Sequence, residues 1–138
     1  MELAKLYGLV CVVINKEGKI LLLKRAPDKK YYPERWATVA AGPISPDTDF
    51  DSFAKKEVKA ETGQEGKMLE SKEQIVFEDQ FDGKLAELHI KPYLFEVDSE
   101  NIILNDEHTE YKWVNKEELL NYNLISEGAK IINSFLNR

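Results

Sequence analysis

Hydrophobic residues in the first part of the chain fall into two dense runs separated by a polar break. Residues 5–14 and 19–25 are rich in valine, leucine and isoleucine, and residues 15–18 (Asn-Lys-Glu-Gly) lie between them. Asparagine and glycine at such a break are typical of a tight turn, so the pattern predicts two strands. Because the runs are almost continuously apolar, we expect both strands to be buried on two faces.

The rest of the chain alternates between polar breaks and apolar segments. A proline-bearing loop at 26–35 leads to a short segment of small residues at 36–42. Beyond residue 72 the pattern predicts strands at 73–81, 85–97 and 111–114 and helices at 116–121 and 125–137. Asp82-Gly83 between the first two of these strands is typical of a hairpin. This order predicts an α+β fold or a layered α/β sandwich.

Residues 50–62 have the period of an amphipathic helix, with Asp47 or Asp49 as its N-cap and Gly63 at its C-terminal end. The apolar arc holds Phe50, Phe53, Ala54, Val58 and Ala60, and the opposite arc holds Asp51, Ser52, Lys55, Lys56, Lys59 and Thr62. Glu57 and Glu61 fall inside the apolar arc, one turn apart.

This position of Glu57 and Glu61 needs an explanation, because a carboxylate removed from water must find a partner, a proton or a cation. Two acids stacked on one helix face can share a single divalent cation. The alternative is a half-exposed helix with both acids at its solvent-exposed edge.

Length and charge narrow the class of protein. With 138 residues, 43% of them hydrophobic, the chain is expected to form one domain over residues 1–138. The 25 acidic and 19 basic side chains give a net charge of −6, which argues against stable nucleic-acid binding through a basic surface. A small phosphorylated substrate bridged by a metal is compatible with that charge.

Cys11 is the only cysteine and lies in an apolar run, so neither an intrachain disulfide nor a cysteine-based metal site is expected. A reducing, cytoplasmic location is the simplest interpretation. The chain starts without the pattern of a signal peptide and contains no run of about eighteen apolar residues, so we expect a soluble protein without a membrane segment. The sequence leaves a monomer and a homodimer open.

From Gly42 to Gln64 the chain reads GPISPDTDFDSFAKKEVKAETGQ and resembles the Nudix box. That pattern is a glycine, five residues, a glutamate, seven residues, then Arg-Glu-aliphatic-x-Glu-Glu-x-Gly-aliphatic. The matching positions are Gly42, Glu57, Val58, Glu61 and Gly63. The departures are Thr48 for the first glutamate, Lys56 for the arginine, Ala60 for the first acid of the pair and Gln64 for the last aliphatic residue.

Two further segments extend the resemblance to nearly the whole chain. WATVAAGPI is similar to the stretch that leads into the box in a branch related to isopentenyl diphosphate isomerase, and NDEHTEYKWVNKEEL is similar to the late segment of the family. The resemblance implies the Nudix fold, a mixed β-sheet sandwiched between helices (α/β/α) in the α+β class.

The resemblance also implies a metal-dependent pyrophosphohydrolase that cleaves a nucleoside diphosphate linked to a small molecule, with Mg²⁺ or Mn²⁺ as cofactor. Glu57 and Glu61 match metal ligands of the family and are candidate catalytic residues. Ala60 stands where a third ligand belongs. Glu107 and Glu110 in the late segment are candidates for an additional ligand or general base, ahead of the aspartates at 47, 49 and 51.

Three further positions match substrate-binding positions of the family. They are Arg25, Gly42 and Lys56. A lysine at position 56 lacks the two-pronged contact of the family's arginine, so its support of Glu57 is expected to be looser. The alternatives are a solvated Lys56 and a solvent-facing Arg25 at a strand end.

Other functions are weighed against the hydrolase. The isomerase branch has a cysteine before the box glycine and a histidine after it, whereas this chain has Ala41 and Pro43, so isomerase activity is not expected. The substitutions Thr48, Lys56 and Ala60 are compatible with low activity. They also motivate the alternative of a non-catalytic Nudix domain that binds a nucleotide or metabolite as a sensor or partner module. A scaffold without any ligand is a third option.

Aromatic and histidine side chains outside the box are weaker candidates for the functional site. Tyr31, Tyr32 and Trp36 border the box and can stack on a base or sugar, although Trp36 fits a core or lid role better. His89 and His108 are far apart in sequence, and we expect them to be structural or solvated rather than metal ligands.

Overall fold

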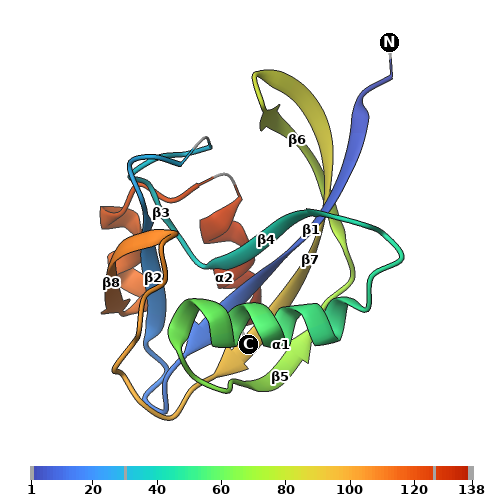
Figure 1. The fold of residues 1–138 in the computed structure, drawn as a ribbon. Helices are drawn as coiled ribbons and strands as arrows, with labels where there is room; N and C mark the ends of the chain where they lie inside the picture. The colour runs from blue at the N-terminus through green and yellow to red at the C-terminus, as the bar shows by residue number, and fades with distance from the viewer. Residues whose placement is uncertain (1, 30, 126, 137–138) are drawn as a thin grey trace.

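Eight strands form one mixed β-sheet in the computed structural model, which describes residues 2–29, 31–125 and 127–136 (Figure 1). The strands are β1 (Ala4–Ile14), β2 (Ile20–Arg25), β3 (Trp36–Ala37), β4 (Val39–Ile44), β5 (Lys67–Ser71), β6 (Ile75–Phe81), β7 (Lys84–Glu96) and β8 (His108–Val114). The helices are α1 (Phe50–Thr62), the 3₁₀ helix η1 (Lys116–Asn121) and α2 (Gly128–Leu136).

The centre of the sheet is a parallel pair, β1 and β7, whose register runs from Ala4↔Ala86 to Ile14↔Glu96. The other pairings are antiparallel. β1 and β2 pair with each other only at Ile14↔Ile20, beside the turn that joins them. Away from this turn, β1 pairs with β4, and β2 pairs with β3 and β8. The sheet therefore splits between β1 and β2, and the two arms diverge (Figure 1).

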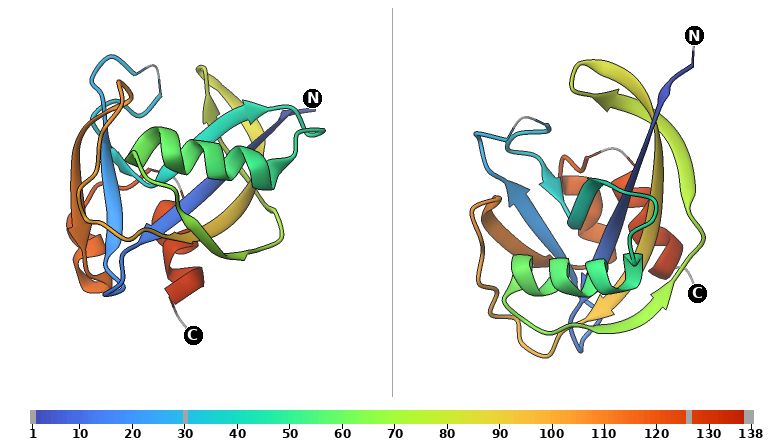
Figure 2. Two further views of the ribbon diagram at one scale, coloured as in Figure 1. Left: turned by 60° about the horizontal axis from the view of Figure 1, so that its bottom comes forward. Right: turned by 45° about the vertical axis from the view of Figure 1, so that its right-hand side comes forward.

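The two longer helices cover opposite faces of this sheet (Figure 2). Neighbouring residues of a strand point to opposite faces, so odd-numbered residues of β1 and β2 pack with α1 and even-numbered residues with α2. The α1 side contains Leu9, Cys11, Val13, Leu21, Leu23, Ala54 and Val58, and the α2 side contains Val12, Ile20, Leu22, Ile131, Ile132 and Phe135. A mixed sheet between helices confirms the predicted fold class.

The ends of α1 are fixed by local signals. Asp49, rather than Asp47, is the N-cap: its side chain accepts hydrogen bonds from Ser52 N at 3.3 Å and Ser52 Oγ at 2.9 Å. Gly63 ends the helix with φ 79°, and its N–H donates to Lys59 O. Among the described residues, no helix combines the length and apolar character needed to cross a membrane.

The helical-wheel assignment was wrong at two positions near the end of α1. Ala60 is exposed, whereas Thr62 is fully buried and its hydroxyl donates to Val58 O at 2.6 Å. Thr62 was expected on the polar arc, but this hydrogen bond satisfies its hydroxyl and allows the side chain to face the core.

Several predicted elements needed correction. β5 was not predicted; its residues alternate between half-buried and exposed, and its Leu69 is 42% exposed. The short segment at 36–42, for which no element was predicted, belongs to β3 and β4, and the helix predicted at 116–121 is a 3₁₀ helix. The last helix begins at residue 128, because residues 123–125 instead exchange backbone hydrogen bonds with Trp36. Its predicted last residue, 137, lies outside the described residues.

Candidate active site

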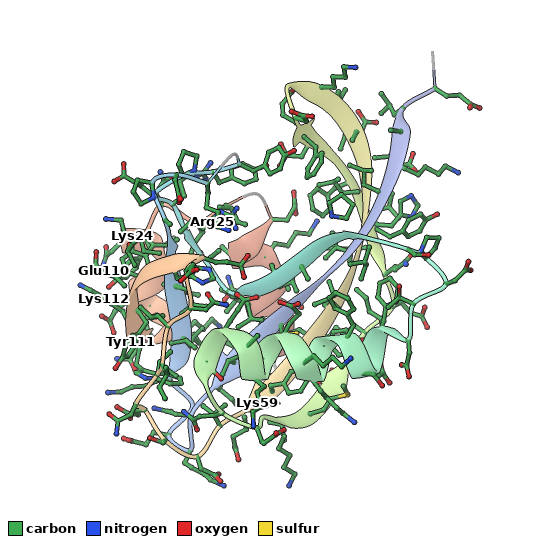
Figure 3. The ribbon with its side chains drawn as sticks, in the orientation of Figure 1. Lys24, Arg25, Lys59, Glu110, Tyr111 and Lys112 are labelled. Atoms are coloured by element: carbon green, nitrogen blue, oxygen red, sulfur yellow. The ribbon has the colours of Figure 1, made fainter. Side chains whose placement is uncertain are left out.

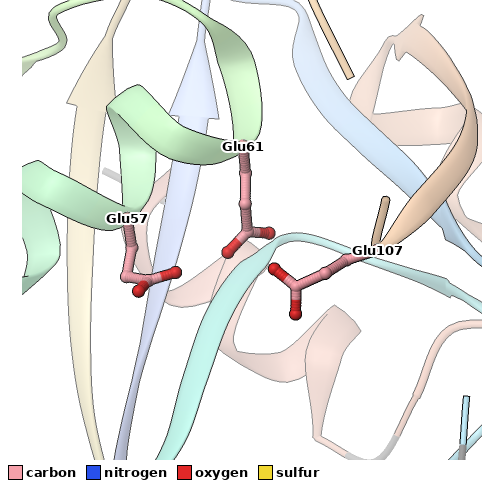
Figure 4. Close-up of side chains that lie close together, drawn as sticks. All are labelled: Glu57, Glu61 and Glu107. Atoms are coloured by element: carbon pink, nitrogen blue, oxygen red, sulfur yellow. The ribbon is translucent and has the colours of Figure 1, made fainter. Parts of the chain in front are cut away.

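Three glutamates from two distant parts of the chain converge beside α1 (Figure 4). Glu57 and Glu61 come from α1, and Glu107 comes from the turn before β8. One carboxylate oxygen from each lies within 4.8 Å of the others. We call these three residues the acidic cluster.

Glu61 is the most deeply buried member of the cluster, with 1% of its surface exposed. Its Oε2 makes no hydrogen bond with any described residue. Burial, a hydrogen bond with Glu57 and the charges of Glu107 and Glu57 raise the pKa of Glu61 to about 10, against a smaller opposing effect of Arg25. Without a cation the Glu61 carboxyl group therefore keeps its proton at neutral pH.

His108 lies behind Glu61, and both side chains are buried. Its Nδ1 is 3.7 Å from Glu61 Oε1 and makes no hydrogen bond with the described residues. Burial lowers the pKa of His108 to about 4, so its ring is neutral at pH 7. Two neutral groups at this distance form neither an ion pair nor a hydrogen bond. Sequence reasoning expected a structural or solvated histidine and did not place it beside Glu61.

Glu107 is half-buried and is tied to the loop after β2. Lys29 Nζ lies 3.3 Å from its Oε1, and Asn105 Nδ2 lies 3.5 Å from its Oε2. Its backbone oxygen accepts a hydrogen bond from the N–H of Ala26 at 3.0 Å. These contacts explain why a residue far along the chain from the box reaches the two glutamates of α1.

Glu110, the other predicted late acid, is not part of the cluster. It pairs across β8 and β2 with Lys24, whose Nζ is 3.5 Å from Glu110 Oε2, and its side chain is 52% exposed. Figure 3 shows both residues on the outer side of these strands, whereas Arg25 lies toward the interior. Glu110 lies only three positions after Glu107, but it is part of β8, and its side chain points to the outer face.

A cavity of about 440 Å³ opens beside the cluster, where the two arms of the sheet diverge. Glu57, Glu107, Arg25 and Gly42 line one part of it. Arg25 Nε donates to Tyr31 O at 2.9 Å, and burial lowers the pKa of its guanidinium against the raising effects of Glu107 and Glu61. The group is still a cation at neutral pH. Lys56 is exposed on α1 and does not line the cavity.

Other cavity residues were missed by sequence reasoning. Phe77, Asp79 and Phe81 of β6 line the cavity together with Tyr31 and Tyr32. Phe77, Asp79 and Phe81 are two positions apart within one strand, which indicates that their side chains share one face. The sequence did not show that this face turns toward the acidic cluster.

The family model of the NUDIX domain matches residues 5–135. The chain belongs to the Nudix family. The family and fold inferred from the degenerate Nudix box are therefore confirmed.

Nudix relatives resemble the chain over most of its length. Nucleoside triphosphatase NudI of Escherichia coli K12 is 28% identical over 123 residues, which cover 84% of this chain and 86% of that protein. The crystal structure of a MutT protein from Methanosarcina mazei has a TM-score of 0.81 and 22% identity, covering 99% of this chain and 96% of the other. The dihydroneopterin triphosphate pyrophosphohydrolase of E. coli has a TM-score of 0.78 and 18% identity, covering 99% and 100%.

The two structural likenesses show the fold alone. The family model places the chain among the Nudix hydrolases, and a nucleoside triphosphatase is one of its relatives in sequence.

Proposed function

We propose that this Nudix protein is a metal-dependent pyrophosphohydrolase that cleaves a nucleoside diphosphate linked to a further group. Glu57, Glu61 and Glu107 hold Mg²⁺ or Mn²⁺, and Arg25 contacts the phosphates. One observation carries the proposal: three carboxylates from α1 and a distant loop converge within 4.8 Å at the wall of a cavity.

The cluster fits a hard divalent cation, which prefers carboxylate oxygens as ligands. Glu61 Oε2 is buried and makes no hydrogen bond with the described residues, which is unfavourable unless the group is protonated or bound to a cation. Two other acids beside it raise its pKa further, and a cation would reverse that effect. Glu107 supplies a third carboxylate in place of the acid missing at Ala60.

The members of the cluster differ in their access to a substrate. Glu57 and Glu107 line the cavity, and Glu61 lies behind them. Mg²⁺ bound here would neutralise phosphate oxygens and lower the pKa of a coordinated water. Glu107 is positioned to accept the proton of the attacking water, because its carboxylate faces the cavity and Lys29 and Asn105 hold it in place. The Arg25 guanidinium offsets the negative charge of the phosphates on the same wall.

The test is hydrolysis of a panel of nucleoside di- and triphosphates with and without Mg²⁺. Glu57→Gln, Glu61→Gln and Glu107→Gln should each lower kcat/KM about tenfold or more, or about 1.4 kcal/mol. Glu110→Gln is the matched control and should retain activity, because that acid faces outward beside Lys24.

Two results would contradict the proposal. One is turnover of the wild type no higher than that of the Glu57→Gln/Glu61→Gln double variant across the panel. The other is equal activity with Mg²⁺ and with EDTA. Nucleotide binding that is insensitive to EDTA and unaccompanied by hydrolysis would instead support the non-catalytic binding module.

A further inference from the structure

Aromatic residues from two separate segments meet at the cavity. Tyr31 in the loop after β2 stacks on Phe81 at the end of β6, with ring centroids 4.2 Å apart and an interplanar angle of 22°. The next residue, Tyr32, donates a hydrogen bond from its hydroxyl to Asp79 Oδ2. Phe77 lies on the same face of β6 and also lines the cavity. We call Tyr31, Tyr32, Phe77, Asp79 and Phe81 the aromatic rim.

Asp79 and Tyr32 are the polar members of this rim, and the direction of their hydrogen bond is fixed. Burial, the hydrogen bond to Asp79 and the charge of that carboxylate raise the pKa of Tyr32 to about 12. The phenol therefore keeps its proton at neutral pH and donates to Asp79. An ionised carboxylate accepts hydrogen bonds and donates none.

The chemistry of the cavity changes from one wall to another. Glu57, Glu107 and Arg25 give the cavity a charged part, and Leu6, Leu88 and Ile90 contribute apolar surface to the same cavity. A volume of about 440 Å³ falls within the range of small-molecule sites. A ligand complementary to all these walls carries phosphates, an apolar connecting portion and a flat ring that offers hydrogen-bond donors.

We propose that the aromatic rim binds the nucleobase of the substrate and that Asp79 is a specificity-determining residue that selects bases with an exocyclic amino group. Aromatic side chains stack on any base, whereas a carboxylate accepts from an amino group and repels a carbonyl oxygen. Cytosine and adenine are therefore preferred over uracil and hypoxanthine. The inference rests on the proposed function, because it assigns the base of the nucleotide whose phosphates the acidic cluster binds.

The competing explanation is that Tyr32 and Asp79 serve only to fasten the loop after β2 to the β6–β7 hairpin. Asp79→Asn and Tyr32→Phe separate the two roles. Both variants disturb the hydrogen bond between the pair, but only Asp79→Asn removes the carboxylate. An asparagine both donates and accepts, so it loses the preference for amino groups.

The experiment measures the binding of four nucleoside monophosphates in EDTA by calorimetry, so that neither metal nor hydrolysis is required. CMP and UMP form one matched pair and AMP and IMP the other. Within each pair an amino group replaces a carbonyl oxygen, and the adjacent ring nitrogen changes from an N–H donor to an acceptor. We expect the wild type to bind the amino member of a pair about tenfold more tightly or better, because a site built around a hydrogen bond rejects a ligand that lacks it.

The variants decide the origin of that preference. Asp79→Asn should bring the two members of each pair within about threefold of each other. Tyr32→Phe should keep the wild-type ratio, as should the control Glu78→Gln, which neutralises an exposed acid one position earlier on β6. Far-UV circular dichroism and thermal unfolding of each variant show whether its fold is intact.

Several outcomes overturn the proposal. They are equal binding within both pairs by the wild type, no binding of any of the four nucleotides, or the same loss of preference in Tyr32→Phe as in Asp79→Asn. If Asp79→Asn unfolds, Tyr32→Phe still tests the proposal. A preference for amino-bearing bases that survives in Tyr32→Phe supports recognition of the base by the Asp79 carboxylate, and loss of that preference contradicts it. Failure of the proposed hydrolase function is distinguished by the turnover panel, which is measured separately with Mg²⁺.

Discussion

At the scale of single residues, Glu61 combines deep burial with two neighbouring acids. Its carboxyl group has a pKa of about 10 in the folded protein, against 4.5 for an ordinary glutamate. Between these values the folded state binds one more proton than the unfolded state. The free energy of unfolding of the metal-free protein must therefore fall as the pH rises through this range.

The measurement is urea unfolding in EDTA at pH 6.5 and pH 8.5. One extra proton bound by the folded state changes the free energy of unfolding by about 1.4 kcal/mol per pH unit, so the wild type should lose about 3 kcal/mol between the two values. Glu61→Gln should remove this loss, because a glutamine side chain has no carboxyl proton to give up. His108 does not contribute to this window: its pKa of about 4 lies below the usual 6.5, so it makes stability rise only between pH 4 and 6.5. A wild-type loss that persists in Glu61→Gln would show that another group causes it.

Single residues also show what the sequence could tell about the site. Glu57 and Glu61 were identified as candidate metal ligands because an acid on the apolar arc of a helix conflicts with the helix periodicity. This conflict is visible within a few neighbouring residues of the sequence. Glu107 could not be separated from Glu110, because a choice between them depends on where β8 begins and on its pairing with β2. The Asp79 carboxylate was missed because nothing near it in sequence shows which surface its strand faces.

At the scale of elements, α1 holds two members of the acidic cluster and ends at a residue with little freedom to change. Gly63 has φ 79°, and a Cβ atom there would lie 2.9 Å from Ile103 Cβ. Ile103 cannot easily move away, because its backbone N–H donates to Thr62 O at 3.0 Å. A side chain at this position meets both backbone strain and a steric clash.

Gly63→Ala should therefore lower the free energy of unfolding by about 2 kcal/mol or more, as measured by urea denaturation. Gly18→Ala is the control, because Gly18 has a similar φ of 81° with nothing within 4 Å of its Cβ position. It should cost only the strain of a left-handed alanine, about 1 kcal/mol. Equal costs for the two variants would show that Ile103 yields without penalty.

Elements whose ends depend on neighbouring residues were predicted well. The bounds of α1 agree with the sequence because Asp49 and Gly63 act within one turn of the helix. The start of α2 was wrong because residues 123–125 bind the backbone of Trp36, a partner far away in sequence. Tertiary pairing of this kind leaves no periodic pattern to read.

At the scale of the whole molecule, we propose that the chain unfolds as one cooperative domain. α1 and α2 cover opposite faces of the sheet. The strands β1 and β2 contribute side chains to the hydrophobic core under α1 and also to the one under α2. A loss of packing under α2 should therefore destabilise the α1 side equally.

Phe135→Ala tests this, because Phe135 on α2 is 1% exposed. It should cost about 3 to 5 kcal/mol, whereas Leu120→Ala at a 93% exposed position should change stability by no more than about 0.5 kcal/mol. In a Trp36→Phe background, fluorescence of Trp113 reports on the α1 side. The proposal is wrong if that signal keeps its midpoint while the far-UV circular dichroism shifts.

The parallel pairing of β1 with β7 has a consequence for biosynthesis. β1 leaves the ribosome before β7, and its register with β7 extends to Ile14↔Glu96, so residues up to 96 must be translated before the two strands can pair in full. Until then the apolar residues of β1 have no complete sheet to enter, and nascent chains in that condition are prone to associate with one another. The architecture that brings the acidic cluster together thus leaves β1 without its longest partner during part of synthesis.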